Sequence, residues 1–188
     1  MEAIIQSFLL VAVSEMGDKT QLLALVLALR YKRPWTIMAG ILVATLLNHG
    51  LASWVGGYVS SLVSPEVLRY TLAAIFGAFA LWILVPDKDE DGPTDDRFGP
   101  FLTTLVTFFL AEMGDKTQLA TVALGARYAS TALVTAGTTL GMLAADGLAD
   151  FTAVKLDRVV PIRWVRLVAA GLFFLFGLGA LAGAAGLF

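Results

Sequence analysis

The chain has 188 residues, of which 58% are hydrophobic and 15% are charged, and its formal net charge is −2. Soluble domains usually contain about 25% charged residues, so this composition argues against a soluble globular protein. The sequence has no cysteine, which excludes disulfides and metal sites built from thiolates.

Long apolar runs divide the chain into predicted membrane spans. A helix needs about 20 apolar residues to cross a hydrocarbon layer ~30 Å thick. The runs here are continuous and do not alternate, which favours helices over barrel strands. The first run begins with Glu2 and has no basic segment before it, so we interpret it as a span and not as a signal peptide. In chain order, the six predicted spans are 2–29, 34–61, 67–86, 99–125, 131–153 and 165–187.

The loops between the spans carry their positive charges unevenly. One side of the membrane holds the loops after spans 1, 3 and 5, with nine lysines and arginines, whereas the other side holds Arg69 and Arg127. Because cytoplasmic loops are enriched in these residues, we predict a multi-pass protein of the cell (inner) membrane with both termini outside. The nine cytoplasmic residues are Arg30, Lys32, Arg33, Lys88, Arg97, Lys155, Arg158, Arg163 and Arg166.

The two halves of the chain are related by a shift of 97 residues, because the octapeptide EMGDKTQL at 15–22 returns at 112–119. Each half contains three spans, an odd number, so the two copies enter the membrane from opposite sides. We therefore predict an all-α integral membrane protein with six transmembrane helices arranged as two inverted three-helix repeats, as in many secondary transporters. The predicted units are a first repeat at 1–86, an acidic cytoplasmic linker at 87–98 and a second repeat at 99–188.

The duplicated octapeptide places charged groups inside two of the spans. In a continuous helix, Glu15 and Asp18 share one face, as do Glu112 and Asp115. A charged group at the bilayer centre costs about 2.5–3.5 kcal/mol, so we expect these faces to turn inward and meet near the midplane. The four carboxylates would form an oxygen cage for a hard divalent cation such as Ca²⁺, Mg²⁺ or Mn²⁺. Neutral oxygen donors beside them are Thr20, Gln21, Thr117 and Gln118.

The lysines and glycines of the motif allow alternative interpretations. Lys19 and Lys116 lie four residues after the glutamates and could form ion pairs that only stabilise the bundle. Each motif has two acids and one base, however, so a surplus negative charge remains. A cation and a proton would compete for it, which is the basis of cation/proton exchange. Gly17 and Gly114 either interrupt the helix and expose carbonyl groups or allow close contact between helices.

Other polar side chains also lie within the predicted spans. His49 and Asp146 correspond under the 97-residue shift, and ionisable groups inside a membrane are functional candidates. His49 could relay protons, and Asp146 could support metal binding or shuttle protons, with a hydrogen-bonded contact between helices as the alternative for both. For Asp150 that contact is the favoured interpretation, and Asn48 is expected to form a hydrogen bond within the bundle.

The linker and the last span carry patterns of their own. DKDEDG at 87–92 matches the start of an EF-hand loop, but Phe98 stands where the bidentate glutamate would be. We therefore interpret this segment as a solvated linker, with weak cation capture as the alternative. The Gly- and Ala-rich last span predicts close helix packing, with a homodimer as one outcome.

Both copies of Glu-Met-Gly-Asp-Lys-Thr resemble the E-x-G-D-K/R-T/S signature of the Gdt-type membrane family, which includes Golgi manganese and calcium exporters of eukaryotes. The resemblance covers essentially the whole chain, with motifs in spans 1 and 4 and an acidic central loop. It implies secondary transport of Mn²⁺ and/or Ca²⁺ out of the cytosol in exchange for protons. The short chain resembles a prokaryotic member in the cytoplasmic membrane, and we interpret the protein as an alternating-access exporter. The signature residues fall on Glu15, Gly17, Asp18, Lys19 and Thr20, and on Glu112, Gly114, Asp115, Lys116 and Thr117.

Three other functions are compatible with the residues themselves. An exporter of small organic solutes, such as amino acids, would use the acids to bind an ammonium group. An intramembrane hydrolase would activate water with paired carboxylates, but it needs two acids tuned to different roles, which identical octapeptides argue against. The third is a non-catalytic scaffold. We expect no enzymatic activity, no cofactor and no nucleic-acid partner; the expected partners are membrane lipid, the transported cation and protons.

Overall fold

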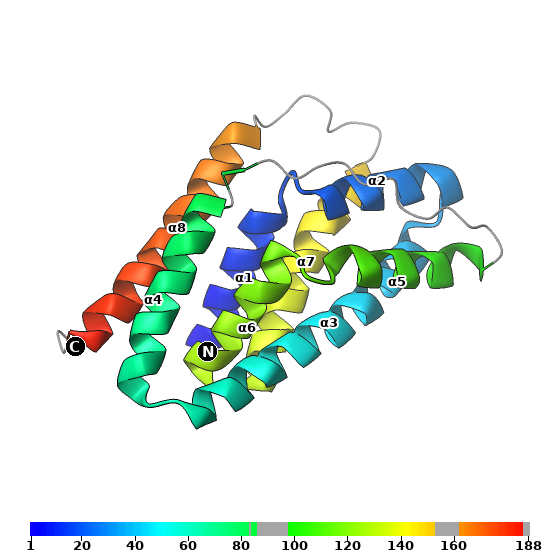
Figure 1. Ribbon diagram of the computed structural model, residues 1–188. Coiled ribbons are helices and arrows are strands. Elements are labelled where there is room, and N and C mark those ends of the chain that lie inside the picture. The colour runs from blue at the N-terminus through cyan, green and yellow to red at the C-terminus, as the bar shows by residue number, and fades with distance from the viewer. Residues whose placement is uncertain (83, 86–97, 153–161, 186–188) are drawn as a thin grey trace.

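A computed structural model of the chain describes residues 1–82, 84–85, 98–152 and 162–185 (Figure 1). Within these residues every regular element is a helix, which confirms the predicted all-α class. The predicted linker at 87–98 lies outside the described residues apart from Phe98. The helices are α1 (Glu2–Glu15), α2 (Lys19–Tyr31), α3 (Pro34–Leu62), α4 (Pro65–Trp82), α5 (Gly99–Glu112), α6 (Lys116–Tyr128), α7 (Thr131–Thr152) and α8 (Ile162–Ala184).

Four of the predicted spans are single helices. The second, third, fifth and sixth spans correspond to α3, α4, α7 and α8. Among the described helices, α3, with 29 residues, is the one whose length and apolar composition suffice to cross a membrane. Two shorter apolar helical segments accompany it, at Gly99–Glu112 and Leu167–Gly183.

The first and fourth predicted spans are each divided in two by the duplicated motif. Residues 16–18 separate α1 from α2, and residues 113–115 separate α5 from α6. The backbone φ is +79° at Gly17 and +78° at Gly114, a conformation that glycine adopts without steric penalty. Of the two interpretations of these glycines, the structure has the interrupted helix. The prediction that the glutamate and aspartate of each motif share one helix face is wrong, because the chain is not helical between them.

The bundle exposes many apolar side chains and buries polar ones beside its apolar core, which consists of two clusters around Phe76 and around Phe108. Large hydrophobic side chains are exposed on all eight described helices, including Leu47, Trp54 and Leu175. Apolar side chains exposed on every described helix are suited to hydrocarbon surroundings. The buried polar side chains include Ser7, Thr45, Asn48, His49, Thr104, Thr107, Thr138 and Asp146.

The packing of the helices follows the sequence repeat. α1 packs along α7, and the equivalent helix α5 packs along α3. In the first contact, a Cβ at Gly137 would lie 2.5 Å from the carbonyl oxygen of Ile4. In the second, a Cβ at Gly40 would lie 2.9 Å from the carbonyl oxygen of Phe101. Gly40 and Gly137 are 97 residues apart, and so are Ile4 and Phe101. The same close approach between helices therefore occurs once in each half and requires glycine both times.

The two halves interlock instead of forming separate cores. The most extensive contacts join helices of different halves: α1 with α7, α3 with α6, α4 with α8, and α3 with α5. The last helices of the two halves, α4 and α8, lie side by side along one edge of the molecule (Figure 1). Phe79 and Phe173 pack edge to face in this contact, with ring centroids 5.6 Å apart. Each half therefore depends on the other for most of its buried surface.

Candidate cation site at the two helix breaks

The two helix breaks are built by the same set of hydrogen bonds. The backbone N–H of Gly17 donates to Oε1 of Gln21 over 2.8 Å, and that of Gly114 donates to Oε1 of Gln118 over 2.7 Å. Each glutamine thus folds back onto its own break and satisfies a backbone donor that a continuous helix would pair with a carbonyl group. The motif residues Asp18 and Asp115 occupy the N-cap positions of α2 and α6, where a carboxylate is favoured by the helix dipole.

The same glutamines connect the breaks to the neighbouring helices. Nε2 of Gln21 donates to the carbonyl oxygen of Ala145 in α7 over 2.9 Å. Nε2 of Gln118 donates to Oδ1 of Asn48 in α3 over 3.2 Å, and position 145 is the repeat equivalent of position 48. Asn48 in turn donates to the carbonyl oxygen of Phe109 over 3.0 Å, which is the hydrogen bond within the bundle that the sequence predicts.

Glu15 is held by hydroxyl groups from both copies of the motif. Its carboxylate is fully buried and accepts a hydrogen bond from Oγ1 of Thr20 over 2.7 Å. It also accepts a hydrogen bond from Oγ1 of Thr117, which belongs to the second copy. Both motif threonines therefore bind one carboxylate, and the two copies meet at Glu15.

Glu112, the repeat equivalent of Glu15, has different surroundings. It is also fully buried, but neither carboxylate oxygen has a hydrogen-bond partner in the part of the chain that the structure describes. Glu15, Asp115, Asp146 and Asp18 are all near enough to act electrostatically on its charge. A buried carboxylate without donors and beside other acids is strongly disfavoured unless a proton or a cation neutralises it.

The motif lysines do not have equivalent surroundings either. Nζ of Lys19 lies 3.6 Å from Oδ2 of Asp115, so this ion pair joins the two copies of the motif. Nζ of Lys116 donates to the carbonyl oxygen of Val85 over 3.0 Å and lies 5.7 Å from the ring centroid of Trp82. The sequence offered ion pairs of Lys19 with Glu15 and of Lys116 with Glu112 as a structural alternative. That alternative assumed a continuous helix, which the break interrupts in each copy.

The remaining sequence candidates lie in α3 and α7. His49 and Asp146 are both fully buried. The two ring nitrogens of His49 have no hydrogen-bond partner among the described residues, whereas Asp146 belongs to the group of acids around Glu112. The side chain of Asp150 lies outside the described residues.

These acids surround one region but do not form a compact cage in the structure. Within the described ranges, no three carboxylate or imidazole groups lie close enough together to hold a single metal ion. Two contributors to the region had no clear signal in the sequence, namely the carbonyl group of Val85 and the ring of Trp82. Both lie just before the linker, in a stretch of sequence that contains no residue of either motif.

Comparisons with known proteins match both halves of the chain. The family described as "Divalent cation/proton antiporter GDT1" matches residues 3–91 and again residues 100–186. A protein of Vibrio cholerae serotype O1 named "Putative manganese exporter" is 45% identical over 183 residues, which cover 95% of this chain and 90% of that protein. "GDT1-like protein sll0615" of Synechocystis sp. is 28% identical over 198 residues, covering 94% and 95% of the two chains. "GDT1-like protein 3" of Arabidopsis thaliana is 27% identical over 202 residues, covering 93% and 68%. No solved structure matches the chain.

A helical bundle with exposed apolar side chains and buried acids at two interrupted helices has the features expected of an ion transporter in a membrane. The family matches extend over nearly all of each half. The chain belongs to the GDT1 family of divalent cation/proton antiporters. Its substrates are divalent cations and protons, and its location is a membrane, as the resemblance of the motif implied.

Proposed function

We propose that this antiporter exports Mn²⁺ from the cytosol in exchange for protons, by alternating access. The relative named as a manganese exporter, 45% identical over nearly the whole chain, supports Mn²⁺ as the cargo. Ca²⁺ is the second candidate, because a donor set of carboxylate and hydroxyl oxygens binds either ion. The protein would contribute Glu15, Asp18, Glu112 and Asp115 as ligands.

The unequal surroundings of the two equivalent glutamates are the observation that carries this proposal. Thr20 and Thr117 stabilise the negative charge on Glu15, whereas Glu112 has no hydrogen-bond donor among the described residues and experiences the negative charges of four other acids. In the absence of a cation, Glu112 would hold a proton. An arriving divalent cation would take the place of that proton, so that cation and proton cannot occupy Glu112 together.

The supporting residues would act around this exchange. Gln21 and Gln118 hold the two breaks in shape, and Lys19 neutralises Asp115 between the motifs. Lys116 begins α6 at the second break and lies beside the ring of Trp82. Asp146 would accept a proton that Glu112 releases, and His49 would serve as a further relay in α3.

We further propose that the chain crosses the membrane six times as two inverted repeats, with both termini outside. The repeated contacts of Gly137 with α1 and of Gly40 with α5 support a two-fold relation between the halves. The excess of lysine and arginine on one side supports the orientation. The repeats would be residues 1–86 and 99–188, joined by a cytoplasmic linker at 87–98. Rocking of the interlocked halves would then open the acids to either side in turn.

Transport by the purified protein in proteoliposomes tests this function. We expect Mn²⁺ uptake into the vesicles to increase when the lumen is more acidic than the outside and to be accompanied by release of protons from the vesicles. We also expect the uptake of Mn²⁺ to exceed that of Ca²⁺ and Mg²⁺. Mn²⁺ movement that is unaffected by the proton gradient would overturn the exchange. Ca²⁺ uptake above that of Mn²⁺ would overturn the assigned cargo and leave the exchange intact.

A further inference from the structure

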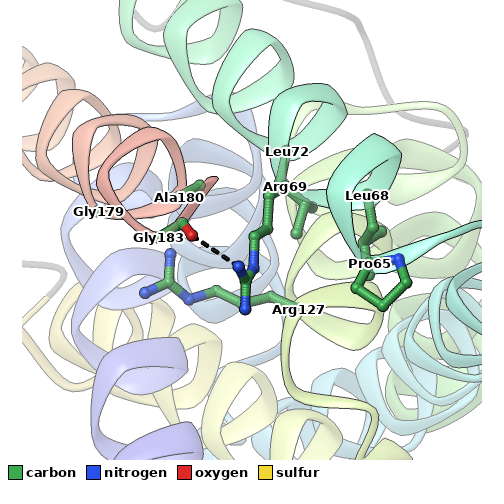
Figure 2. Close-up of a pocket in the computed structure, with 8 residues that line it drawn as sticks. All are labelled: Pro65, Leu68, Arg69, Leu72, Arg127, Gly179, Ala180 and Gly183. Atoms are coloured by element: carbon green, nitrogen blue, oxygen red, sulfur yellow. Dashed lines mark hydrogen bonds between the residues drawn. The ribbon is translucent and has the colours of Figure 1, made fainter. Parts of the chain in front are cut away.

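A pocket lined by two arginines lies at the end of the bundle that holds both chain termini (Figures 1 and 2). Its volume is about 240 Å³. Arg69 enters it from the first turns of α4, Arg127 enters it from the last turn of α6, and α8 contributes the backbone at Gly179 and Gly183. None of these residues belongs to the motifs, and the pocket has no part in the exchange proposed above.

Both guanidinium groups lie against the backbone of α8. Nη1 of Arg69 donates to the carbonyl oxygen of Gly183 over 2.6 Å, the dashed bond in Figure 2. A Cβ at Gly179 would lie 3.7 Å from Nη2 of Arg127. The two glycines are four residues apart on α8, about one helical turn, so both guanidinium groups lie against the same stretch of this helix. The small residues of α8 therefore bring two like charges together.

Most of the hydrogen-bonding capacity of these arginines is unused. Arg127 donates to the carbonyl oxygen of Phe176 over 3.2 Å, and its guanidinium carbon lies 5.0 Å from the centroid of the Phe176 ring. A guanidinium group has five N–H donors, and each of these two arginines uses one or two for contacts within the described residues. Neither arginine forms an ion pair with a carboxylate of the described residues.

A second cavity adjoins the first at Arg127. Its volume is about 300 Å³, and leucines of α1 and α8 line it together with Gln6 and Phe176. Arg127 therefore stands between a pocket with two positive charges and a largely apolar groove. Such a pair of cavities is complementary to a molecule with an anionic head and an apolar tail.

We propose that these two cavities bind an anionic phospholipid, with its phosphate between Arg69 and Arg127 and an acyl chain along the groove between α1 and α8. The planar fork of arginine matches the oxygens of a phosphate group. An anion between the two guanidinium groups also removes their mutual repulsion, which is strong where water is scarce. In the proposed orientation the site faces the outer leaflet. The bound lipid would join α4, α6 and α8 and thereby stabilise the contact between the two halves.

Lipid-dependent stability of the full chain tests this site without any cation or gradient, so its outcome is separable from that of the transport assay. The purified protein in maltoside detergent is titrated with dioleoylphosphatidylglycerol while its Tm is measured. We expect Tm to rise with lipid concentration, because a ligand of the folded state stabilises it by mass action. Higher salt is expected to weaken the effect, because the attraction is between charges.

Substitutions of the two arginines locate the effect. Arg69→Gln and Arg127→Gln are each expected to weaken the lipid affinity at least about tenfold, because each removes charge-assisted hydrogen bonds. Arg33→Gln is the matched control, since Arg33 is exposed and lines neither cavity. Arg127→Lys keeps the charge and loses the fork, so it provides a folded variant with reduced affinity should Arg127→Gln fail to fold. Equal lipid affinity in all four variants would overturn the proposal.

Two further ligands identify what is recognised. Dioleoylglycerol has the same acyl chains without phosphate, and an equal rise in Tm with it would overturn recognition of the phosphate. Inorganic phosphate at the same concentration has no chains, and an equal rise with it would overturn the assignment to a lipid. We expect both to raise Tm far less than dioleoylphosphatidylglycerol does.

Discussion

Glu15 and Glu112 have identical neighbours in the sequence and different neighbours in space. Two threonine hydroxyl groups donate to Glu15, and other acids surround Glu112. Identical octapeptides therefore do not give identical acids, because residues from other helices determine what each carboxylate contacts. The sequence argument against a hydrolase, which relied on that identity, does not hold; membership of an antiporter family is what makes the chain a transporter.

At Glu112, removal of the charge is expected to abolish the exchange. Glu112→Gln keeps the size of the side chain but can neither release a proton nor bind a cation by charge. Mn²⁺ uptake into proteoliposomes under an imposed proton gradient measures the effect. Glu66→Gln is the control, because Glu66 is exposed in the first turn of α4. Transport by Glu112→Gln at the rate of the unmodified chain would exclude Glu112 from the exchange.

At Thr117, loss of one hydroxyl group is expected to weaken cation binding without preventing transport. Thr117→Val removes the donor that reaches Glu15 from the second motif. Outer partners of a metal ligand typically contribute about 10–100-fold in affinity, so we expect a similar loss in the apparent affinity for Mn²⁺. Thr121→Val is the control, because Thr121 lies one turn further along α6 and donates to the carbonyl oxygen of Thr117. If the two variants have equal affinity, the bond to Glu15 has no role in binding.

At the scale of the elements, the two helix breaks decide the position of every motif side chain. Each break turns the chain between a helix that ends at a glutamate and one that begins at a lysine. The aspartate between them becomes an N-cap, and the glutamine one turn later closes the break. The acids therefore belong to helix ends, where backbone groups without helical partners are available to the site.

The backbone conformation of Gly114 at the second break predicts how a substitution there changes the stability of the protein. Among the described residues a Cβ at Gly114 would meet nothing within 4 Å, but φ there is +78°. Gly114→Ala is therefore expected to destabilise the protein by about 1–2 kcal/mol through the left-handed conformation, which lowers Tm by roughly 2–8 °C.

Gly77→Ala is the matched control for this substitution. A Cβ at Gly77 would likewise meet no atom of the described part of the chain within 4 Å, but Gly77 lies inside α4, where alanine is favoured over glycine by roughly 0.5–1 kcal/mol. Tm in detergent should therefore rise for Gly77→Ala and fall for Gly114→Ala. A rise for both would show that the break at Gly114 is a helix in solution.

The helices could be predicted from the sequence more completely than their interruptions. Hydropathy and turn residues place α3, α4, α7 and α8 within a few residues of their observed ends. The reason is that a helix in lipid needs an apolar run of about its own length. The breaks were one of two interpretations, since hydropathy does not register a positive φ at Gly17. The partner of Lys19 was not predictable, because it comes from a segment 96 residues away and the expected pairing assumed an intact helix.

At the scale of the whole molecule, the exposed apolar side chains and the contacts between the two halves have one common explanation. Large apolar side chains are exposed on every described helix, polar groups are buried inside the bundle, and the most extensive contacts join helices of different halves. Both features are expected when two repeats enclose a polar region inside a membrane.

The absence of cysteine in the sequence allows a direct test of orientation. Lys32→Cys lies in the turn between α2 and α3, Ser64→Cys lies in the turn between α3 and α4, and both positions are exposed. A thiol reagent that does not cross membranes is expected to label Ser64→Cys in intact cells. It is expected to label Lys32→Cys only after the cells are permeabilised. The unmodified chain is the control, and the reverse labelling pattern would place the termini in the cytoplasm.

The proposed cation site takes side chains from both repeats, because Thr117 of the second repeat donates a hydrogen bond to Glu15 of the first. A gene divided at the linker would yield two polypeptides that are inactive when produced separately and regain exchange when produced together. An ancestor with a single copy would have needed two molecules, inserted in opposite directions, to build the same pocket. Fusion of the two copies removes that dependence on concentration and leaves each copy free to acquire side chains that its counterpart lacks.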